Sequence, residues 1–592
     1  MEFETRFVVE QVHTALLADS ADNAHPLSNP GVGSPQAVSA MFSTITYNKG
    51  ASIIRQTEHF LGSEVHTQGL INYLKRRSFL TAKPIDLFVD LESVGIETGA
   101  LEAYGPQFNF IEYYKSWTEQ PGHPLLSVNV NHATGRMTIT QRRFSINTGF
   151  SSAPTNYIVP ITFARARDPD FSNTKPSHIL TDSVTIIDRG SVGDEWVIFN
   201  KQQTGFYRVN YDDYTWNLIA LALRGDDRTR IHEYNRAQIV NDLFQFARSG
   251  VMTYNRAFNL LAFLENETEY APWFAAITGI NWLRNRLASS PDLLLELNDV
   301  VIKWANTVMT QLTYVPRDGE SWIESYLRYQ LAPLMCAMGV PACRAAATTQ
   351  FQALRDTDTP VPVDSRNWVY CNALREGTTS DFDFLWDRFL THNVYTEKIV
   401  LLQTLGCTPY NSSLYKFVNA IVSDNFEVRP QDYTTAFSSA VNGNEGNTMI
   451  VFAYIQDYLD QVTQAFNSAT TPLAYISSRL RTESQVLEFQ RWVNDSRADL
   501  GDDYQAVYNN ANAALESIQW VQDVSSDLND YFTGDDITFD TTTSSSTTTE
   551  QITTVTPGLL VEPITPEFPN SAVSTAVSLL LLSLGVTVHW FF

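Results

Sequence analysis

The sequence predicts a mainly α-helical protein with one small β-sandwich, placed between a helical N-terminal region and an α-helical solenoid. Three observations lead to this fold class. Of the 592 residues, 44% are hydrophobic and 12% aromatic, which is enough apolar surface for several folded domains. Apolar residues recur with the helical period in residues 1–122 and 215–532. In residues 123–214 they alternate with polar residues, as in strands.

The N-terminal region, residues 1–122, is expected to be helical around a single loop. Residues 23–35 are rich in Pro, Gly, Asn and Ser, which is the composition of a loop. The apolar residues that follow are spaced for one face of a helix that stops at Gly62, because glycine commonly ends helices. These apolar residues are Met41, Ile45, Ile53, Ile54, Phe60 and Leu61.

Residues 123–214 are expected to form a small antiparallel β-sandwich. Apolar and polar residues alternate around Val128 and again around Ile139, and residues 132–135 between them have the sequence of a turn. This pattern predicts a β-hairpin. Two further strands are predicted at residues 196–199 and 207–211, where apolar residues form a short run or share one face.

Residues 215–532 return to the helical period and keep it. Ile239, Leu243 and Phe246 stand at positions i, i+4 and i+7, and Gly250 follows where a C-terminal cap would lie. Many helices joined by short loops, without strand signals, favour antiparallel helix pairs stacked as a solenoid. The sequence has no strict repeat period, so this prediction depends on the density of helices alone.

The C-terminal residues predict a stalk and a lipid-anchor signal. Residues 533–569 are rich in Thr and Ser and have little apolar surface to bury, so we expect an extended, O-glycosylated stalk. Residues 570–592 have the layout of a glycosylphosphatidylinositol (GPI) attachment signal, with cleavage near Asn570 before an apolar tail. A membrane-spanning helix and a buried terminal helix are the alternatives, although no Lys or Arg follows the tail.

A GPI signal acts only on chains that have entered the secretory pathway. The first residues carry acidic side chains at Glu2 and Glu4 and no long apolar run, so they do not form a signal peptide. We therefore expect a native form with more sequence before Met1. That form would be located on the extracellular face of the plasma membrane, held there through the GPI anchor.

The charge of the chain argues against a nucleic-acid partner. Forty basic and 65 acidic residues give a net charge of -25, which repels phosphate backbones. The four cysteines, Cys336, Cys343, Cys371 and Cys407, fit no metal-binding spacing. Two disulfides in an oxidising compartment, with three pairings open, or four buried reduced thiols are the alternatives. Three Asn-x-Ser/Thr sequons, at Asn266, Asn411 and Asn494, permit N-glycosylation of a secreted chain.

Several segments, taken in order, resemble one known family. The most informative is Phe-Ser-Thr-Ile-Thr-Tyr-Asn-Lys-Gly-Ala-Ser at residues 42–52. Others are found at residues 25–27, 117–124, 141–144, 205–212 and 235–238. Together they resemble the aminopeptidase N family of zinc metalloaminopeptidases, from near residue 10 to about residue 532. The resemblance implies that residues 1–122 are the helical end of the catalytic domain.

Members of this family remove single residues from the free amino ends of peptides, and they use zinc held by a His-Glu-x-x-His motif and a later Glu. No His-Glu-x-x-His occurs in this chain, so we expect no zinc ligands in it. The segment that begins His232-Glu233 does not complete this motif, because Arg236 stands where the second His would be and a cationic side chain cannot bind zinc. We interpret the segment as the start of a surface helix. The chain alone is therefore expected to be inactive.

Two site residues carry over from the resemblance. Tyr47 matches the catalytic tyrosine of the family, whose phenol stabilises the oxyanion of the tetrahedral intermediate. Phe42 matches a residue of the substrate pocket wall. The alternatives are that Tyr47 is a buried structural tyrosine and that Phe42 only packs in the core. The family also implies the disulfides Cys336–Cys343 and Cys371–Cys407.

Our leading hypothesis is the C-terminal part of a membrane-anchored zinc aminopeptidase with peptide substrates, most similar to insect gut members. The rival is a noncatalytic, glycosylated surface module that acts as a receptor, because some insect gut members serve as docking sites for bacterial toxins. A cytosolic helical scaffold is the third hypothesis. The sequence leaves homodimer formation and the preferred amino-terminal residue open.

Overall fold

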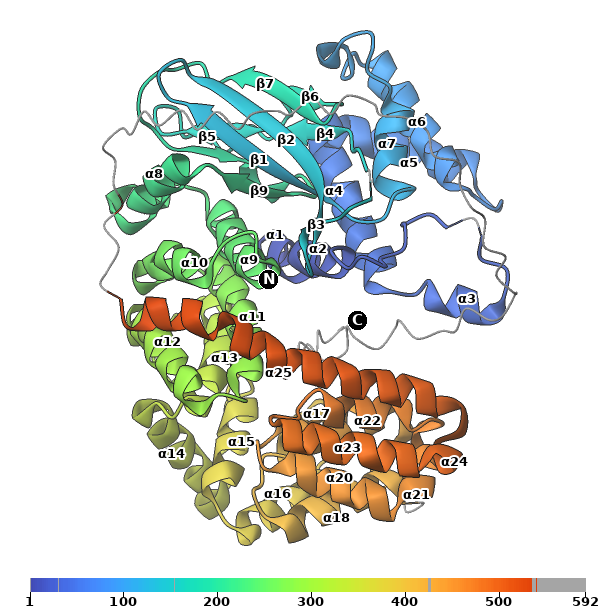
Figure 1. Cartoon of the computed structure of the whole chain (residues 1–592), viewed down its shortest axis with the longest axis vertical. Helices are drawn as coiled ribbons and strands as arrows, with labels where there is room; N and C mark the ends of the chain where they lie inside the picture. The colour runs from blue at the N-terminus through green and yellow to red at the C-terminus, as the bar shows by residue number, and fades with distance from the viewer. Residues whose placement is uncertain (1, 30, 154, 424–426, 535–538, 540–592) are drawn as a thin grey trace, which may run out of the picture.

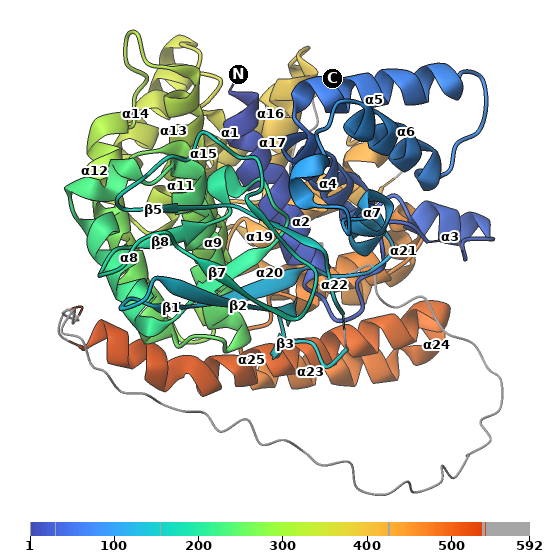
Figure 2. The ribbon, with the colours of Figure 1, turned by 90° about the horizontal axis from the view of Figure 1, so that it is seen from above.

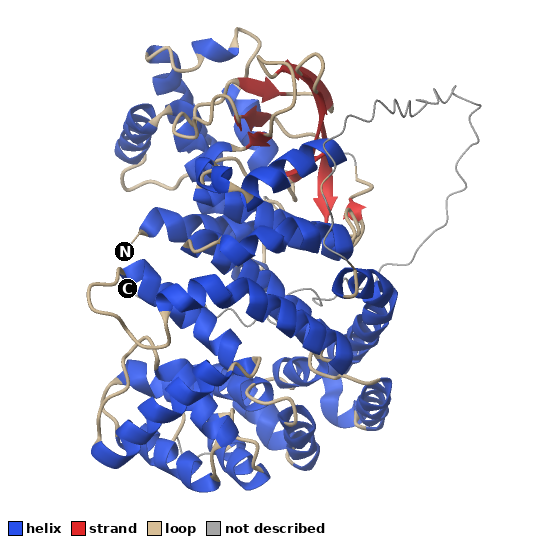
Figure 3. Cartoon of the chain, turned by 90° about the vertical axis from the view of Figure 1, so that its left-hand side faces the viewer, coloured by secondary structure: helices blue, strands red, loops and turns tan. Residues whose placement is uncertain are grey.

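The computed structural model describes residues 2–29, 31–153, 155–423, 427–534 and 539 (Figure 1). The predicted GPI signal with Asn570, and nearly all of the predicted stalk, lie outside these residues. The fold is mainly α-helical, with its strands gathered at one end of the molecule (Figure 3). The predicted fold class is confirmed.

The N-terminal region is helical, as expected. Its elements are α1 (Phe3–Arg6), η1 (Phe7–Val12), α2 (His13–Asp19), α3 (Pro35–Ala40), η2 (Ile45–Lys49), α4 (Gly50–Leu61), α5 (Ser63–Arg76), α6 (Pro84–Glu97), η3 (Glu102–Tyr104) and α7 (Phe110–Thr118). Two of them, η1 and η2, are π-helical segments that contact each other. The helix predicted after the loop ends at Gly62, whose φ of 88° lies in the region that favours glycine.

The β-rich region has one five-stranded sheet and two short ladders. The strands are β1 (Pro124–Asn131), β2 (Arg136–Ser145), β3 (Gly149–Phe150), β4 (Val159–Ile161), β5 (Phe163–Arg165), β6 (His178–Leu180), β7 (Val184–Asp188), β8 (Val197–Phe199) and β9 (Arg208–Tyr211). The order β3-β2-β1-β9 forms the main sheet, with β7 also paired to β2. The ladders pair β4 with β6 and β5 with β8. The predicted hairpin is present, and within it Val128 lies opposite Ile139.

The expectation of a purely antiparallel sandwich is wrong at one pair of strands. β9 runs parallel to β1, with Leu126 opposite Val209. Parallel neighbours need a long connection to bring the chain back to its starting end, and the whole β2–β8 segment provides it. Local alternation shows that a strand exists but not which strand becomes its neighbour.

The C-terminal region contains the remaining helices. They are α8 (Asp213–Arg224), η5 (Asp226–Arg230), α9 (Glu233–Ser249), α10 (Tyr254–Leu261), η6 (Ala262–Asn266), α11 (Tyr270–Leu287), α12 (Pro291–Leu312), α13 (Trp322–Ala337), α14 (Pro341–Thr357), α15 (Arg366–Glu376), α16 (Thr379–Thr391), α17 (Tyr395–Leu405), α18 (Asn411–Val422), η7 (Pro430–Asp432), α19 (Tyr433–Asn442), α20 (Asn447–Asp457), α21 (Leu459–Phe466), α22 (Thr470–Ser477), α23 (Glu483–Asp495), α24 (Arg497–Leu500), η8 (Gly501–Asp503) and α25 (Tyr504–Phe532).

These helices stack as a solenoid. The odd-numbered helices α9, α11, α13, α15, α17 and α19 contact one another in succession and form one row. The last helix, α25, has 29 residues and contacts α10 and α12 near one end of the stack and α22 and α23 near the other. Figure 2 shows α23 and α25 side by side along one edge of the molecule.

Candidate functional site

Tyr47 lies on η2 and is accessible to solvent. Its side chain is 51% exposed, and that of Phe42 is 70% exposed. The two ring centroids are 6.4 Å apart, with an angle of 42° between the ring planes. Neither residue belongs to the core, so a buried structural tyrosine and core packing of Phe42 do not describe this structure.

The backbone around Tyr47 is held by local hydrogen bonds. The Tyr47 amide donates to the Ser43 carbonyl over 3.1 Å. His25 binds this turn from the preceding loop: its Nε2 lies 3.0 Å from the Ser43 hydroxyl, and its Nδ1 lies 2.8 Å from the Pro26 carbonyl. Short π-helical segments such as η2 occur frequently at functional sites.

A buried ion pair fixes the opposite side of the same helix. The Lys49 Nζ atom lies 2.9 Å from Asp19 Oδ2, and both side chains are fully buried. Lys49 also donates to the carbonyls of Gln120 and Gly122 at 3.3 and 3.2 Å, and the Gly122 amide donates to Asp19 over 2.9 Å. Residues two apart on a helix point in nearly opposite directions. This pair therefore sets the rotation of the helix that presents Tyr47.

Further contacts connect the Tyr47 helix to its surroundings. Asn48 donates to Gln11 Oε1 on η1 over 2.7 Å. Arg55, two turns further along, donates to the Gln203 carbonyl over 2.8 Å. Gln203 belongs to a turn in which Asn200, Gln202 and Gln203 all have positive φ. The helix is thus tied both to the N-terminal helix and to the β-rich region.

The segment that begins at His232 is a helix start, with His232 and Glu233 half-buried and most of the residues that follow buried. The side chain of His232 caps α9 by accepting from the Tyr234 amide over 3.2 Å. Arg236 is buried and its Nε atom lies 2.7 Å from Glu267 Oε2. The expectation of a surface helix is wrong because α9 buries most of its polar residues against partners distant in the sequence.

Two groups at the start of α9 have strongly shifted pKa values. Burial, followed by the nearby charge of Glu269, raises the pKa of Glu233 to about 7. Burial, followed by the nearby charge of Arg236, lowers the pKa of His232 to about 4. At neutral pH His232 is therefore uncharged, while Glu233 is close to its titration midpoint.

The side chains that the structure describes are not grouped as zinc ligands. Within the part of the chain that the structure describes, no group of three or more His, Cys, Asp and Glu side chains is placed to hold a metal. Tyr47 and Phe42 are therefore the site residues that the structure brings together, and the metal ligands implied by the resemblance have no counterpart among the described side chains.

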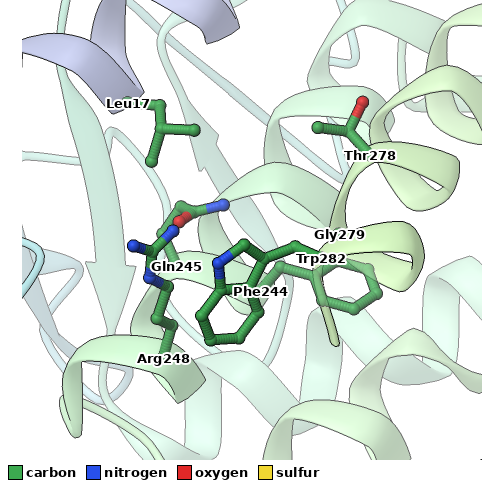
Figure 4. A pocket seen from close by; sticks show the side chains of 7 residues that line it. All are labelled: Leu17, Phe244, Gln245, Arg248, Thr278, Gly279 and Trp282. Carbon is green, nitrogen blue, oxygen red and sulfur yellow. The ribbon is translucent and has the colours of Figure 1, made fainter. Parts of the chain in front are cut away.

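Two hollows elsewhere do not include Tyr47 or Phe42. One, between α2, α9 and α11, has a volume of about 10 Å³ and is lined by residues that include Gln245, Arg248 and Trp282 (Figure 4). Such a volume holds about one water molecule, not a peptide. The other lies along the β-rich region, has a volume of about 590 Å³ and is lined by residues that include Arg165 and Arg167.

The cysteines form the two disulfides that the resemblance implies. Cys336 is bonded to Cys343, and Cys371 to Cys407. All three sequon asparagines, Asn266, Asn411 and Asn494, are exposed, so each is sterically available for glycosylation. Within the described residues no single helix has the length and apolar character to cross a membrane, although the α13–α14 pair, bent by 108°, meets both criteria when taken together.

Comparisons with known proteins agree with this arrangement. Residues 1–103 match the model of the peptidase family M1 domain. Residues 196–544, more than half of the chain, match that of the ERAP1-like C-terminal domain. An M1 segment followed by this C-terminal domain defines a class of peptidases.

The relatives narrow the class. The chain is 60% identical over 590 residues to a membrane alanyl aminopeptidase of Heliothis virescens, with 99% of this chain and 58% of the relative covered. It is 41% identical to the membrane alanyl aminopeptidase of Manduca sexta, with 99% and 59% covered. It is 26% identical to human aminopeptidase N, with 87% and 54% covered. The chain belongs to the aminopeptidase N family and spans a little more than half the length of these relatives.

Proposed function

We propose that this chain is the C-terminal part of a membrane-anchored aminopeptidase that removes N-terminal residues from peptides. The observation that carries the proposal is an exposed phenol, Tyr47, on a helix whose other side is locked by the buried Lys49–Asp19 pair. The names of its insect relatives, both membrane alanyl aminopeptidases, support the reaction class and the membrane location.

In this function, Tyr47 donates a hydrogen bond to the oxyanion that forms when water adds to the scissile carbonyl. A donor fixed in advance stabilises this charge more than it stabilises the uncharged substrate. The ring of Phe42, 6.4 Å from that of Tyr47, forms part of the wall against the first substrate residue. Family M1 enzymes are in general zinc peptidases, and the metal chemistry of a longer form would have to come from residues outside those described.

The test places Tyr47→Phe in a longer form that carries the zinc motif of the family. We expect a loss of about 100- to 1000-fold in kcat with little change in KM, because the phenol acts on the transition state. Hydrolysis of alanyl p-nitroanilide measures both constants. A kcat within twofold of wild type would reject the role of Tyr47.

The anchoring and modification of the chain belong to the same proposal. We place the protein on the outer face of the plasma membrane, attached by a GPI anchor near Asn570 and glycosylated at Asn266, Asn411 and Asn494. Sequencing the transcript before Met1 separates the two main hypotheses. A secretory signal followed by a His-Glu-x-x-His motif supports the peptidase, whereas a secretory signal joined directly to this chain supports a noncatalytic receptor.

A further inference from the structure

Five arginines from distant parts of the chain gather at one junction of the solenoid. They come from the last turns of α11 and α15 and from the segment between α22 and α23. A carboxylate from the turn between α19 and α20 lies among them. We name the whole group the arginine cluster, and its members are Arg284, Arg286, Arg375, Arg479, Arg481 and Glu445.

Hydrogen bonds join an early helix of the solenoid to a late segment at this junction. Arg481 donates from Nη1 to the Asn285 carbonyl over 2.9 Å and from Nη2 to the Asn285 side-chain oxygen over 2.8 Å. Glu445 accepts from Arg479 over 2.5 Å and from Arg481 over 3.2 Å. Asn285 and Arg481 are 196 residues apart in the chain. The arginine cluster is therefore a product of the assembled fold, which sequence patterns do not reveal.

The arginine cluster carries more positive charge than its surroundings balance. Glu445 pairs with two of the arginines, whereas the other three form no ion pair with any residue that the structure describes. Arg375 donates instead to a backbone carbonyl at the end of α19, and the neighbouring Arg344–Glu376 pair adds no net charge. The C-terminal ends of α11 and α19 each contribute about half a negative charge, so about three positive charges remain.

Crowding of these cations lowers their pKa values without discharging them. Burial, followed by the nearby charge of Arg375, lowers the pKa of Arg284 to about 10. Burial, followed by the nearby charge of Arg479, lowers the pKa of Arg481 to about 10. The Arg479 Nε atom is buried and has no hydrogen-bond partner among the described residues. At neutral pH the cluster is therefore fully charged and still has N–H donors to offer.

We propose that the arginine cluster binds a small multivalent oxyanion that carries at least two phosphate or sulfate groups. Guanidinium groups match the oxygens of such groups with paired N–H donors. The Glu445 side chain is 60% exposed, so the cluster is open to solvent on that side. The chain as a whole has a net charge of -25 and repels anions, which makes this attraction local. The inference is independent of the proposed peptidase activity.

Calorimetric titration of the purified full chain tests the proposal, in a buffer whose salt, about 0.15 M, screens weak surface attraction. The probes are myo-inositol hexakisphosphate and a heparin-derived tetrasaccharide, with uncharged myo-inositol as the control ligand. We expect at least one charged probe to bind with a Kd of about 1–100 μM.

Three variants locate the binding. The double variant Arg284→Gln with Arg286→Gln should weaken it about 10-fold or more, because two of the unpaired cations are lost. Glu445→Gln should tighten it several-fold, because it removes the carboxylate that competes with the anion. The matched control, Arg491→Gln with Arg497→Gln, removes two exposed cations from α23 and α24 and should leave the affinity unchanged.

The two probes distinguish the sources of the oxyanion. Binding of the tetrasaccharide alone would identify a sulfated carbohydrate, and binding of the hexakisphosphate alone a soluble phosphate. No binding of either charged probe, or equal losses in the cluster double variant and in the control, would overturn the proposal. If the cluster double variant does not fold, Glu445→Gln decides: tighter binding supports the proposal and unchanged binding rejects it. None of these results depends on the Tyr47→Phe assay.

Discussion

Lys49 shows how one buried residue supports an exposed one. Its ammonium group and the Asp19 carboxylate, 2.9 Å apart, are both fully removed from solvent. The sequence places Lys49 next to Tyr47 but gives no sign of a partner 30 residues earlier, because pairs distant in sequence are set by tertiary packing. The sequence motif singles out Tyr47, whereas nothing in the sequence indicates the buried ion pair on the same helix.

Replacing Lys49 tests this support. We expect Lys49→Met to lower the free energy of unfolding by about 3–5 kcal/mol, because an unpaired buried carboxylate remains. The control is Lys416→Met, which removes the exposed pair Lys416–Asp383 at the same 2.9 Å distance and should change stability by less than about 1 kcal/mol. Urea unfolding followed by circular dichroism measures the free energy of unfolding of both variants. Equal losses would show that the buried Lys49–Asp19 pair stabilises the fold no more than the exposed pair does.

Glu233 gives a prediction about pH. Its pKa in the folded chain is raised to about 7, above the ordinary value of 4.5, so the folded state holds a proton that the unfolded state has released. The stability that Glu233 contributes is present below about pH 4.5 and is lost as the pH rises through 7.

We therefore expect Glu233→Gln to raise the melting temperature at pH 8.5 and to have little effect at pH 4.5. At pH 8.5 the variant should gain about 1–3 kcal/mol in the free energy of unfolding, since each pKa unit corresponds to about 1.4 kcal/mol. Glu483→Gln, at the exposed first position of α23, controls for the loss of a charge at a helix start. A gain for Glu233→Gln that is the same at both pH values would contradict the titration of this carboxyl.

At the scale of elements, local sequence patterns predicted where strands and helices begin and end. They did not predict which elements or side chains become neighbours in the fold. The hairpin of β1 and β2 and the end of α9 at Gly250, where φ is 75°, follow from alternation and capping, and both were predicted. The parallel neighbour β9 and the burial of α9 were not predicted. From the sequence alone, Arg236 is expected at the surface. Its partner Glu267 comes beside it only in the folded chain. Such pairs depend on the assembled fold.

The two disulfides stabilise different lengths of chain. Cys371–Cys407 closes a separation of 36 residues and connects α15 to the turn after α17, whereas Cys336–Cys343 closes only seven. Loss of a cross-link releases unfolded-chain entropy that grows with loop length. We expect the double Ser variant at Cys371 and Cys407 to lose about 4 kcal/mol, and that at Cys336 and Cys343 about 2 kcal/mol. Equal losses in denaturant titrations would contradict the loop-length argument.

At the scale of the whole molecule, exposed apolar side chains are concentrated near the N-terminus. Of the 27 large hydrophobic side chains exposed in the described residues, 12 lie between Phe3 and Ile96. This region coincides with the match to the M1 peptidase domain at residues 1–103. Apolar surface of this extent is typical of interfaces or of aggregation.

We expect the isolated chain to self-associate through this surface. A triple variant that changes Leu74, Phe79 and Leu80 to Ser should reduce the aggregated fraction several-fold in size-exclusion chromatography with light scattering. The control is a triple variant that changes Leu295, Val363 and Leu487 to Ser. It removes similarly exposed apolar side chains from the solenoid and should leave the aggregated fraction unchanged. A wild-type chain that is monomeric and melts cooperatively would contradict this expectation.

We infer that this chain supplies the oxyanion donor of an aminopeptidase but not its metal site. The most direct test measures bound zinc and alanyl p-nitroanilide hydrolysis on the same purified full chain, after incubation with zinc and removal of the excess. We expect well under one equivalent of zinc and no turnover above background. One equivalent of zinc with turnover that falls in Tyr47→Phe would contradict it, because the chain would then hold a complete active site.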